Sequence, residues 1–194
     1  MIRLCAALAA MAVAGAMAAA PERVADGNAI VSHRDPALRI ALSQPVQYAG
    51  ADRFVLLGMA DCELHAFVEA DARKSVRRLY WIQFEQYLPS RPELAHAYNS
   101  PRHATLGGMD FYVDTWVSQG LPAEPGSDVE HLRALLRKDG YTLPPGMVNV
   151  RFVHLLDKAK RKELMIIYGE DPALAGGSLD GLPERAARGI SFSR

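Results

Sequence analysis

The chain is poor in cysteine and has no excess of either charge. Its 194 residues include only Cys5 and Cys62, and Cys5 lies in an apolar segment at the start of the chain. If that segment is removed, Cys62 has no partner, so no intramolecular disulfide can form. The 22 basic and 22 acidic residues balance, which is not typical of a general nucleic-acid binder. We therefore expect packing to stabilise the fold, and we expect no nucleic-acid partner.

Several catalytic and cofactor motifs are also absent from the sequence. It contains no G-x-G-x-x-G, no phosphate-binding P-loop, no H-E-x-x-H zinc motif and no G-x-S-x-G nucleophile motif. Strands and helices do not alternate along the chain as they do in nucleotide-binding α/β folds. The sequence thus predicts neither a cofactor nor a bound metal.

One long hydrophobic run is present, and it opens the chain. A basic start at Arg3 precedes an uncharged, alanine-rich stretch, and Ala16-Met17-Ala18 fits the small-x-small cleavage pattern. We predict a cleaved secretory signal peptide over 1–18. An uncleaved anchor is the weaker alternative, because the run is rich in Ala rather than Leu or Ile. The expected product is a soluble exported protein, periplasmic or secreted, without a transmembrane segment after cleavage.

The remaining chain predicts a loose lead-in over 19–36 and a single α+β domain over 37–194. Strand-like segments alternate apolar and polar residues, or form short apolar runs bounded by Gly or Pro. They are 38–42, 53–59, 61–70, 76–88, 109–117, 148–156 and 163–168. These segments favour an antiparallel β-sheet of about five to seven strands. The segment 90–108 is predicted as a long loop with one helical turn near 93–98.

One main helix is expected over 127–139. Ser127 and Glu130 have the spacing of a capping box, and Gly140 is placed to end the helix. Val129, Leu132, Leu135 and Leu136 form an apolar stripe. A second, short C-terminal helix near 182–188, ended by Gly189, completes the predicted α+β fold, in which the sheet packs against the main helix.

The predicted hairpin over 61–88 carries the strongest functional signal. Alternation assigns Cys62, Leu64, Ala66 and Val68, and Val76, Tyr80, Ile82, Phe84 and Leu88, to the core. The opposite positions combine acids, an imidazole, an amide and aromatics, and we interpret them as one shared face. They are Glu63, His65, Trp81, Gln83, Glu85 and Tyr87. If the helix or the 90–108 loop covers this face, it becomes a ligand pocket. A solvated sheet face is the competing interpretation.

The leading functional hypothesis is binding of a small or extended polar or aromatic ligand by these six residues. An alternative is an acid–base hydrolase or isomerase that uses Glu63, His65 and Glu85, so the sequence leaves enzymatic activity open. Glu63 and His65, with His154 or Glu85, are also chemically suitable metal ligands, but no compact motif supports that role. The other histidines are interpreted as surface or loop residues; they are His33, His96, His103 and His131.

Cys62 and His65 differ by an odd number, so a regular strand places them on opposite faces and argues against a thiol enzyme. Two basic turns allow a second alternative, an envelope interaction protein that contacts an anionic surface. This contact requires both turns to lie at one end of the sheet. Their residues are Arg73, Lys74, Arg77 and Arg78 in the first turn, and Lys158, Lys160, Arg161 and Lys162 in the second.

Overall fold

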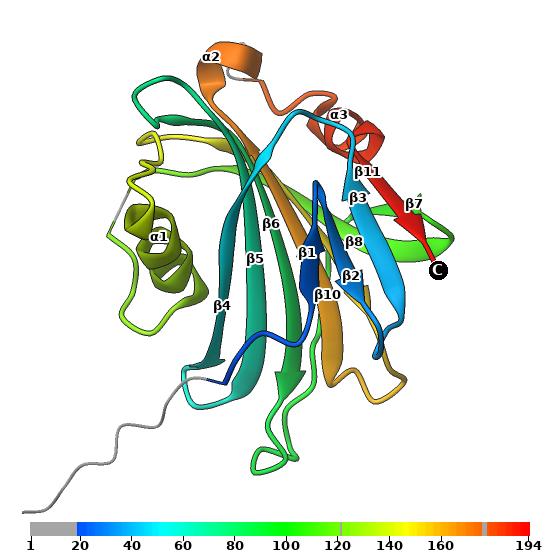
Figure 1. The fold of residues 1–194 in the computed structure, drawn as a ribbon. Coiled ribbons are helices and arrows are strands. Elements are labelled where there is room, and N and C mark those ends of the chain that lie inside the picture. Colours follow the sequence, from blue (N-terminus) through cyan, green and yellow to red (C-terminus); the bar gives the residue numbers. More distant parts are fainter. Residues whose placement is uncertain (1–18, 121, 176–177) are drawn as a thin grey trace, which may run out of the picture.

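The computed structural model describes residues 19–120, 122–175 and 178–194, so the predicted signal peptide over 1–18 lies outside the described residues. Two antiparallel sheets form the fold (Figure 1). The larger sheet has the order β4-β5-β6-β10-β9-β8-β7 and the smaller one β1-β2-β3-β11. The predicted α+β class, built on an antiparallel sheet, is confirmed.

The bounds of the elements agree closely with the sequence pattern for the longer strands. The large sheet consists of β4 (Gln47–Leu56), β5 (Ala60–Ala70), β6 (Val76–Tyr87), β7 (Arg102–Leu106), β8 (Met109–Val117), β9 (Val148–Leu155) and β10 (Lys162–Glu170). The small sheet consists of β1 (Val24–Asp26), β2 (Ala29–Ser32), β3 (Leu38–Leu42) and β11 (Ile190–Ser193). The helices are α1 (Asp128–Lys138), α2 (Pro172–Ala175) and α3 (Leu182–Arg188).

Helix α1 is the longest described helix and begins where its cap predicts. The Ser127 Oγ accepts the backbone N–H of Glu130 at 3.3 Å. The Glu130 carboxylate accepts the N–H of Gly126 rather than that of Ser127, so only half of the expected capping box forms. Gly140 adopts a positive φ of 77° just beyond the helix, a conformation that glycine takes without steric cost.

Two predictions along the chain were wrong. The stretch 19–36 is not a loose lead-in, because it contains β1 and β2, and Ala29 and Ile30 are fully buried. The segment 90–108 contains no helical turn; its second part is strand β7. These three strands are only three to five residues long, so pairing with their neighbours, and not local alternation, determines them.

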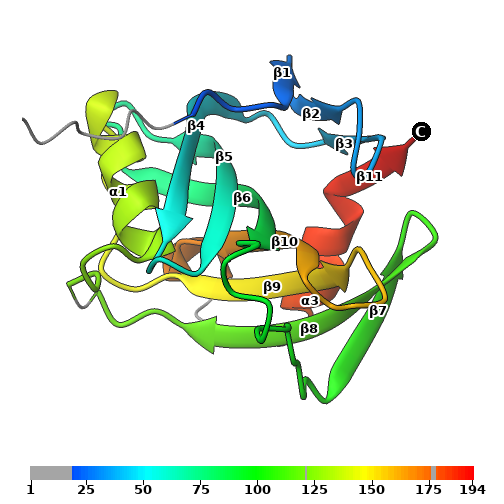
Figure 2. The ribbon, with the colours of Figure 1, turned by 90° about the horizontal axis from the view of Figure 1, so that it is seen from below.

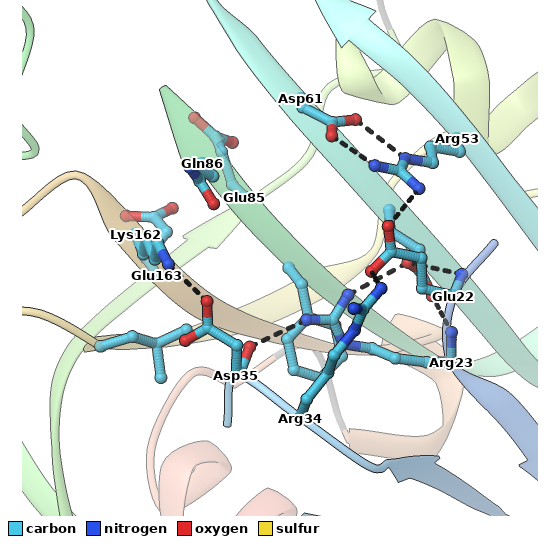
Figure 3. Close-up of a pocket in the computed structure, with 13 residues that line it drawn as sticks. Glu22, Arg23, Arg34, Asp35, Arg53, Asp61, Glu85, Gln86, Lys162 and Glu163 are labelled. Atoms are coloured by element: carbon cyan, nitrogen blue, oxygen red, sulfur yellow. Dashed lines mark hydrogen bonds and ion pairs between the residues drawn. The ribbon is translucent and has the colours of Figure 1, made fainter. Parts of the chain in front are cut away.

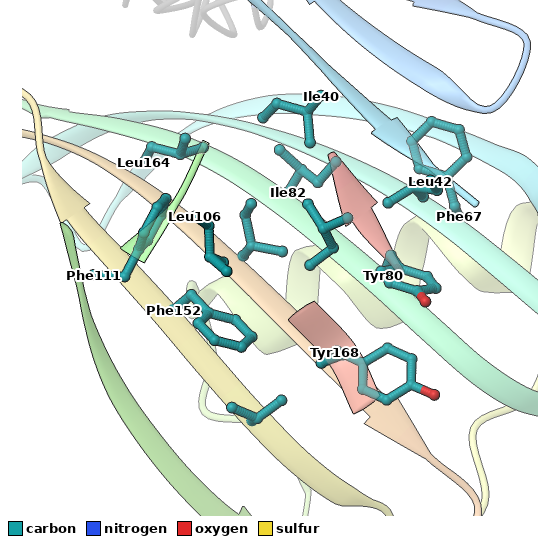
Figure 4. Close-up of a cluster of buried hydrophobic side chains, with 14 of the residues drawn as sticks. Ile40, Leu42, Phe67, Tyr80, Ile82, Leu106, Phe111, Phe152, Leu164 and Tyr168 are labelled. Atoms are coloured by element: carbon teal, nitrogen blue, oxygen red, sulfur yellow. The ribbon is translucent and has the colours of Figure 1, made fainter. Parts of the chain in front are cut away.

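Both faces of the large sheet are buried, each against a different partner. We call the face toward the small sheet the inner face and the face toward α1 the outer face. The inner core contains Phe67, Tyr80 and Ile82, together with Ile40 of the small sheet (Figure 4). The outer core joins residues such as Leu64 to the apolar stripe of α1. Figure 2 shows the strongly twisted sheet between these two coverings.

Candidate functional site

The six predicted site residues do not share one face of the β5–β6 hairpin. The register pairs Glu63 with Phe84, and Cys62 with Glu85. Directly opposite residues of an antiparallel pair project from the same face. Glu63 and His65 therefore lie on the inner face, whereas Trp81, Gln83, Glu85 and Tyr87 follow the outer face. The expected single polar–aromatic face is a wrong prediction, although the predicted core positions on both strands, Leu88 excepted, are buried.

A β-bulge causes this separation. The pairing shifts between Glu69 and Ala70, where Ala70 pairs with Val76 but Glu69 pairs with Arg78. The extra residue on β6 is Arg77. Because successive side chains alternate faces, one inserted residue moves every later position of β6 to the opposite face relative to β5. Without the bulge, Glu63 and Gln83 would be direct partners.

On the inner face, Glu63 and His65 form a buried hydrogen-bonded network. Glu63 Oε1 lies 2.8 Å from His65 Nε2, and His65 Nδ1 lies 2.9 Å from the Tyr48 hydroxyl. The Glu63 carboxylate also accepts the backbone N–H groups of Glu22 and Arg23, at 2.9 and 2.7 Å. The Arg23 guanidinium donates to it at 3.0 Å. These bonds fasten the residues just before β1 to strand β5 of the large sheet.

The surroundings of Glu63 hold its carboxylate in the ionised form. Burial alone would raise its pKa, but the hydrogen bonds from His65 and from the N–H groups of Glu22 and Arg23, together with the Arg23 charge, lower the pKa to about 2. Burial and the Glu63 charge raise the pKa of Tyr48 to about 12. A phenol with a raised pKa and a fully partnered carboxylate favour a structural role over acid–base catalysis.

A charged cleft of about 230 Å³ borders this network (Figure 3). Apart from Glu85 and Glu163, which also border it, its cations and acids form ion pairs with one another. Arg53 binds Asp61 and Glu22 at 2.6 and 2.7 Å, Arg34 binds Glu22, and Lys162 binds Asp35. Because these charges are already paired, the cleft offers a charged ligand few unmatched groups, and we do not assign it a function.

On the outer face, three β6 side chains form a chain of hydrogen bonds. Trp81 Nε1 donates to Gln83 Oε1 at 3.0 Å, and Gln83 Nε2 donates to Glu85 Oε2 at 3.2 Å. The Cys62 thiol also donates to Glu85 Oε2, at 3.4 Å. Burial, followed by the Glu85 charge, raises the pKa of Cys62, so this thiol stays protonated and is a poor nucleophile. His65 lies on the opposite face, as the odd spacing predicts.

The row of hydrogen bonds from Trp81 through Gln83 ends at Glu85, which belongs to the acid–histidine cluster. We define this cluster as Glu85, His96 and Glu163. Glu85 and Glu163 are direct cross-strand partners on β6 and β10. His96 Nδ1 lies 3.0 Å from Glu163 Oε2, and the Tyr98 hydroxyl donates to the same oxygen at 2.6 Å. Glu163 is 3% exposed and His96 is 6% exposed. Two carboxylates thus meet an imidazole; Glu163 and His96 are buried, and Glu85 is half-buried.

The protonation of the cluster reflects this crowding. Burial, and then the neighbouring Glu163 carboxylate, raise the pKa of Glu85. Burial alone would lower the pKa of His96, but its hydrogen bond to Glu163 and the charges of Glu163 and Glu85 raise it overall. The cluster therefore attracts positive charge.

Trp81 lies at the other end of this row of hydrogen bonds, where it reaches the helix cleft. We define the helix cleft as two adjoining cavities beside α1, of about 370 and 110 Å³. The cavities share Gly120, Arg133, Leu143, Pro144 and Pro145. The smaller cavity is also lined by both tryptophans of the chain, Trp81 and Trp116, and by Leu79, Ser118, Val129, Leu132, Met147, Asn149 and Ile167. Trp81, at the base of the smaller cavity, is 4% exposed, whereas Trp116, at its rim, is 37% exposed.

The geometry weakens both alternative functions expected from the sequence. Glu63 and His65 are separated from Glu85 by the sheet, so the three side chains cannot act on one substrate atom. The two basic turns lie at opposite ends of the sheet, because Glu170 pairs with Arg78 at one end and Lys162 with Gln86 at the other. They do not form a single cationic patch.

Sequence reasoning missed three important contributors. His96 is a loop residue, as predicted, but it is buried. Glu163 lies far from Glu85 in the sequence, and Trp116 was interpreted only as part of an alternating strand. The available signal was the pairing of two hairpins that each carry an outer-face acid, but their register decides whether the acids meet.

Within the described ranges, no helix is long and apolar enough to cross a membrane.

Comparisons with family models, with curated proteins and with solved structures found no match. Function must therefore be argued from the helix cleft and the acid–histidine cluster themselves.

Proposed function

We propose that the chain is an exported binding protein that holds a small, mainly apolar or aromatic ligand in the helix cleft. The observation that carries this proposal is that both tryptophans line one cavity between α1 and the large sheet. Indole rings supply large flat surfaces for stacking, and one N–H group each for orientation. Protein sites for small molecules are typically concave and apolar, with a few polar groups.

The lining of the cleft supports an apolar ligand with a limited polar portion. Leu79, Leu132 and Ile167 supply aliphatic surface, while Ser118 and Asn149 add polar atoms. The larger cavity, of about 370 Å³, falls within the usual range of ligand pockets, which is about 300–1,000 Å³. The charged cleft on the inner face lacks this composition.

Binding is tested with the fluorescent apolar probe N-phenyl-1-naphthylamine and the full mature chain. We expect saturable binding by the wild-type protein. Val129→Phe adds a ring to the wall of the smaller cavity, so it should weaken probe binding at least about fivefold, which corresponds to about 1 kcal/mol. Val55→Phe is the matched control, because Val55 is 52% exposed on β4 and does not line the cleft.

Equal weakening by both substitutions, or no saturable binding by the wild type, would count against the proposal. Circular dichroism and thermal unfolding of Val129→Phe would establish that its fold is intact. If this variant is unfolded, Leu143→Ala provides the opposite test, since it widens both cavities and should alter probe affinity.

Export is a separate part of the proposal and rests on the alanine-rich start and the Ala16-Met17-Ala18 site. Mass spectrometry of the protein recovered outside the cytoplasm should give a mature N-terminus at Ala19. An intact Met1 on the exported protein would refute cleavage while leaving the cleft hypothesis untouched.

A further inference from the structure

The acid–histidine cluster is independent of the proposed ligand cleft and has the composition of a metal site. Glu85, His96 and Glu163 each offer one ligand atom, and these atoms lie within 4.8 Å of one another. Metal–ligand bonds to nitrogen and oxygen are about 2 Å long. Small side-chain rotations are therefore enough to bring all three atoms onto one ion.

The protein alone does not balance this cluster. Like charges placed directly opposite on paired strands destabilise a sheet, and Glu85 and Glu163 occupy such positions. His96 Nε2 is buried and has no hydrogen-bond partner among the described residues. Buried polar atoms without partners are rare in folded proteins, and each one calls for an explanation. A cation held between these ligand atoms would neutralise the two facing carboxylates.

The loop that carries His96 is held firmly in place. The Arg161 guanidinium donates to five backbone carbonyls of the preceding segment, at distances from 2.7 to 3.4 Å; they belong to Tyr87, Leu88, Arg91, Pro92 and Leu94. The His96 backbone N–H donates to Lys160 O at 2.7 Å. The His96 ring stacks on Tyr87 with a centroid distance of 4.3 Å. Such support is what a preorganised site requires of its surroundings.

We propose that Glu85, His96 and Glu163 bind one divalent transition-metal ion of the zinc class. An imidazole beside two carboxylates suits zinc better than calcium, which prefers six to eight oxygen ligands. The Tyr98 hydroxyl, at 2.6 Å from Glu163 Oε2, orients one carboxylate from outside, as second partners of metal ligands commonly do. Three protein ligands leave a coordination position for water or for a ligand atom.

The test is isothermal titration of the chelator-treated mature chain with ZnCl₂ and, separately, with CaCl₂. We expect one zinc ion per chain and weaker binding of calcium. His96→Ala and Glu163→Gln should each weaken zinc binding at least about tenfold. The matched controls are His103→Ala and Glu93→Gln, which replace an exposed histidine and an exposed glutamate and should leave zinc binding within about twofold.

Three results would overturn the proposal: no saturable zinc binding, unchanged binding in both His96→Ala and Glu163→Gln, or tighter binding of calcium than of zinc. If Glu163→Gln fails to fold, Glu85→Gln takes its place, because it relieves the repulsion between the carboxylates. That variant must also lose at least about tenfold in zinc affinity.

Discussion

The two faces of the large sheet bury polar side chains in opposite ways. On the inner face, Glu63 accepts four hydrogen bonds or ion pairs from the N-terminal segment and His65. On the outer face, Glu85 faces a second carboxylate, and His96 keeps a nitrogen without a partner among the described residues. A buried polar group whose hydrogen bonds and charge are all matched by the protein stabilises the fold. A group with an unmatched charge or an unpaired atom is available to bind a ligand or an ion.

The largest expected effect falls on the inner face. Glu63→Gln removes the charge that Arg23 and two backbone N–H groups share, so we expect a loss of about 3 kcal/mol in the free energy of unfolding. Urea denaturation at neutral pH measures it. Glu69→Gln on the same strand is the control; its ion pair with Arg78 is partly exposed and should cost less than about 1 kcal/mol. Similar losses in the two variants would remove the distinction.

Acid should remove the difference in stability between the wild type and Glu63→Gln. The pKa of Glu63 is about 2 in the folded chain, compared with 4.5 for an ordinary glutamate side chain. Because the folded pKa is lowered, its contribution to stability is complete above pH 4.5 and disappears as the pH falls toward 2. The stability gap between wild type and Glu63→Gln should therefore narrow over this interval in denaturation curves. A gap that stays constant would show that the carboxylate charge does not stabilise the fold.

The next largest effect on stability concerns the loop that carries His96. Arg161→Ala leaves five backbone carbonyls without their donor, so we expect about 2 kcal/mol of destabilisation and faster hydrogen exchange over 88–96. Lys158→Ala, at an exposed position of the same turn, should change neither quantity. Unchanged exchange over 88–96 in Arg161→Ala would show that the guanidinium does not hold the loop.

The smallest expected effect has the opposite sign. In chelator-treated protein at neutral pH, Glu85→Gln removes one of two directly opposite carboxylates and should stabilise the fold by about 1 kcal/mol. Glu93→Gln, at an exposed site of the nearby loop, should change stability by less than about 0.5 kcal/mol. Thermal unfolding compares them. Destabilisation by Glu85→Gln would mean that its hydrogen bonds to Cys62 and Gln83 outweigh the repulsion.

The sequence predicts much of this fold because local signals and tertiary packing agree there. The cap at Ser127 and the leucine stripe place α1 within one residue at each end, and alternation places β8 and both long hairpins. Short strands such as β1, β2 and β7 carry no such pattern, since their neighbours determine them.

The candidate site was less predictable because it depends on register. One bulged residue, Arg77, moves Glu63 and Gln83 to opposite faces, and neither side chain signals this in advance. Likewise, His96 meets Glu163 from a loop whose carbonyls before His96 are bound by Arg161, which is distant in the sequence. The separation of the two faces, and with it the separation of structural and binding roles, becomes visible only in the assembled sheet.

The most direct test of the helix cleft uses the two tryptophans as reporters. Trp81→Phe leaves only Trp116 at the exposed rim, and Trp116→Phe leaves only Trp81 at the buried base. Each single-tryptophan protein is titrated with N-phenyl-1-naphthylamine while its indole emission is recorded. If a ligand enters the cleft, the remaining indole is quenched saturably in both single-tryptophan proteins. Quenching of Trp116 alone would place the probe on the surface and contradict a ligand site between α1 and the sheet.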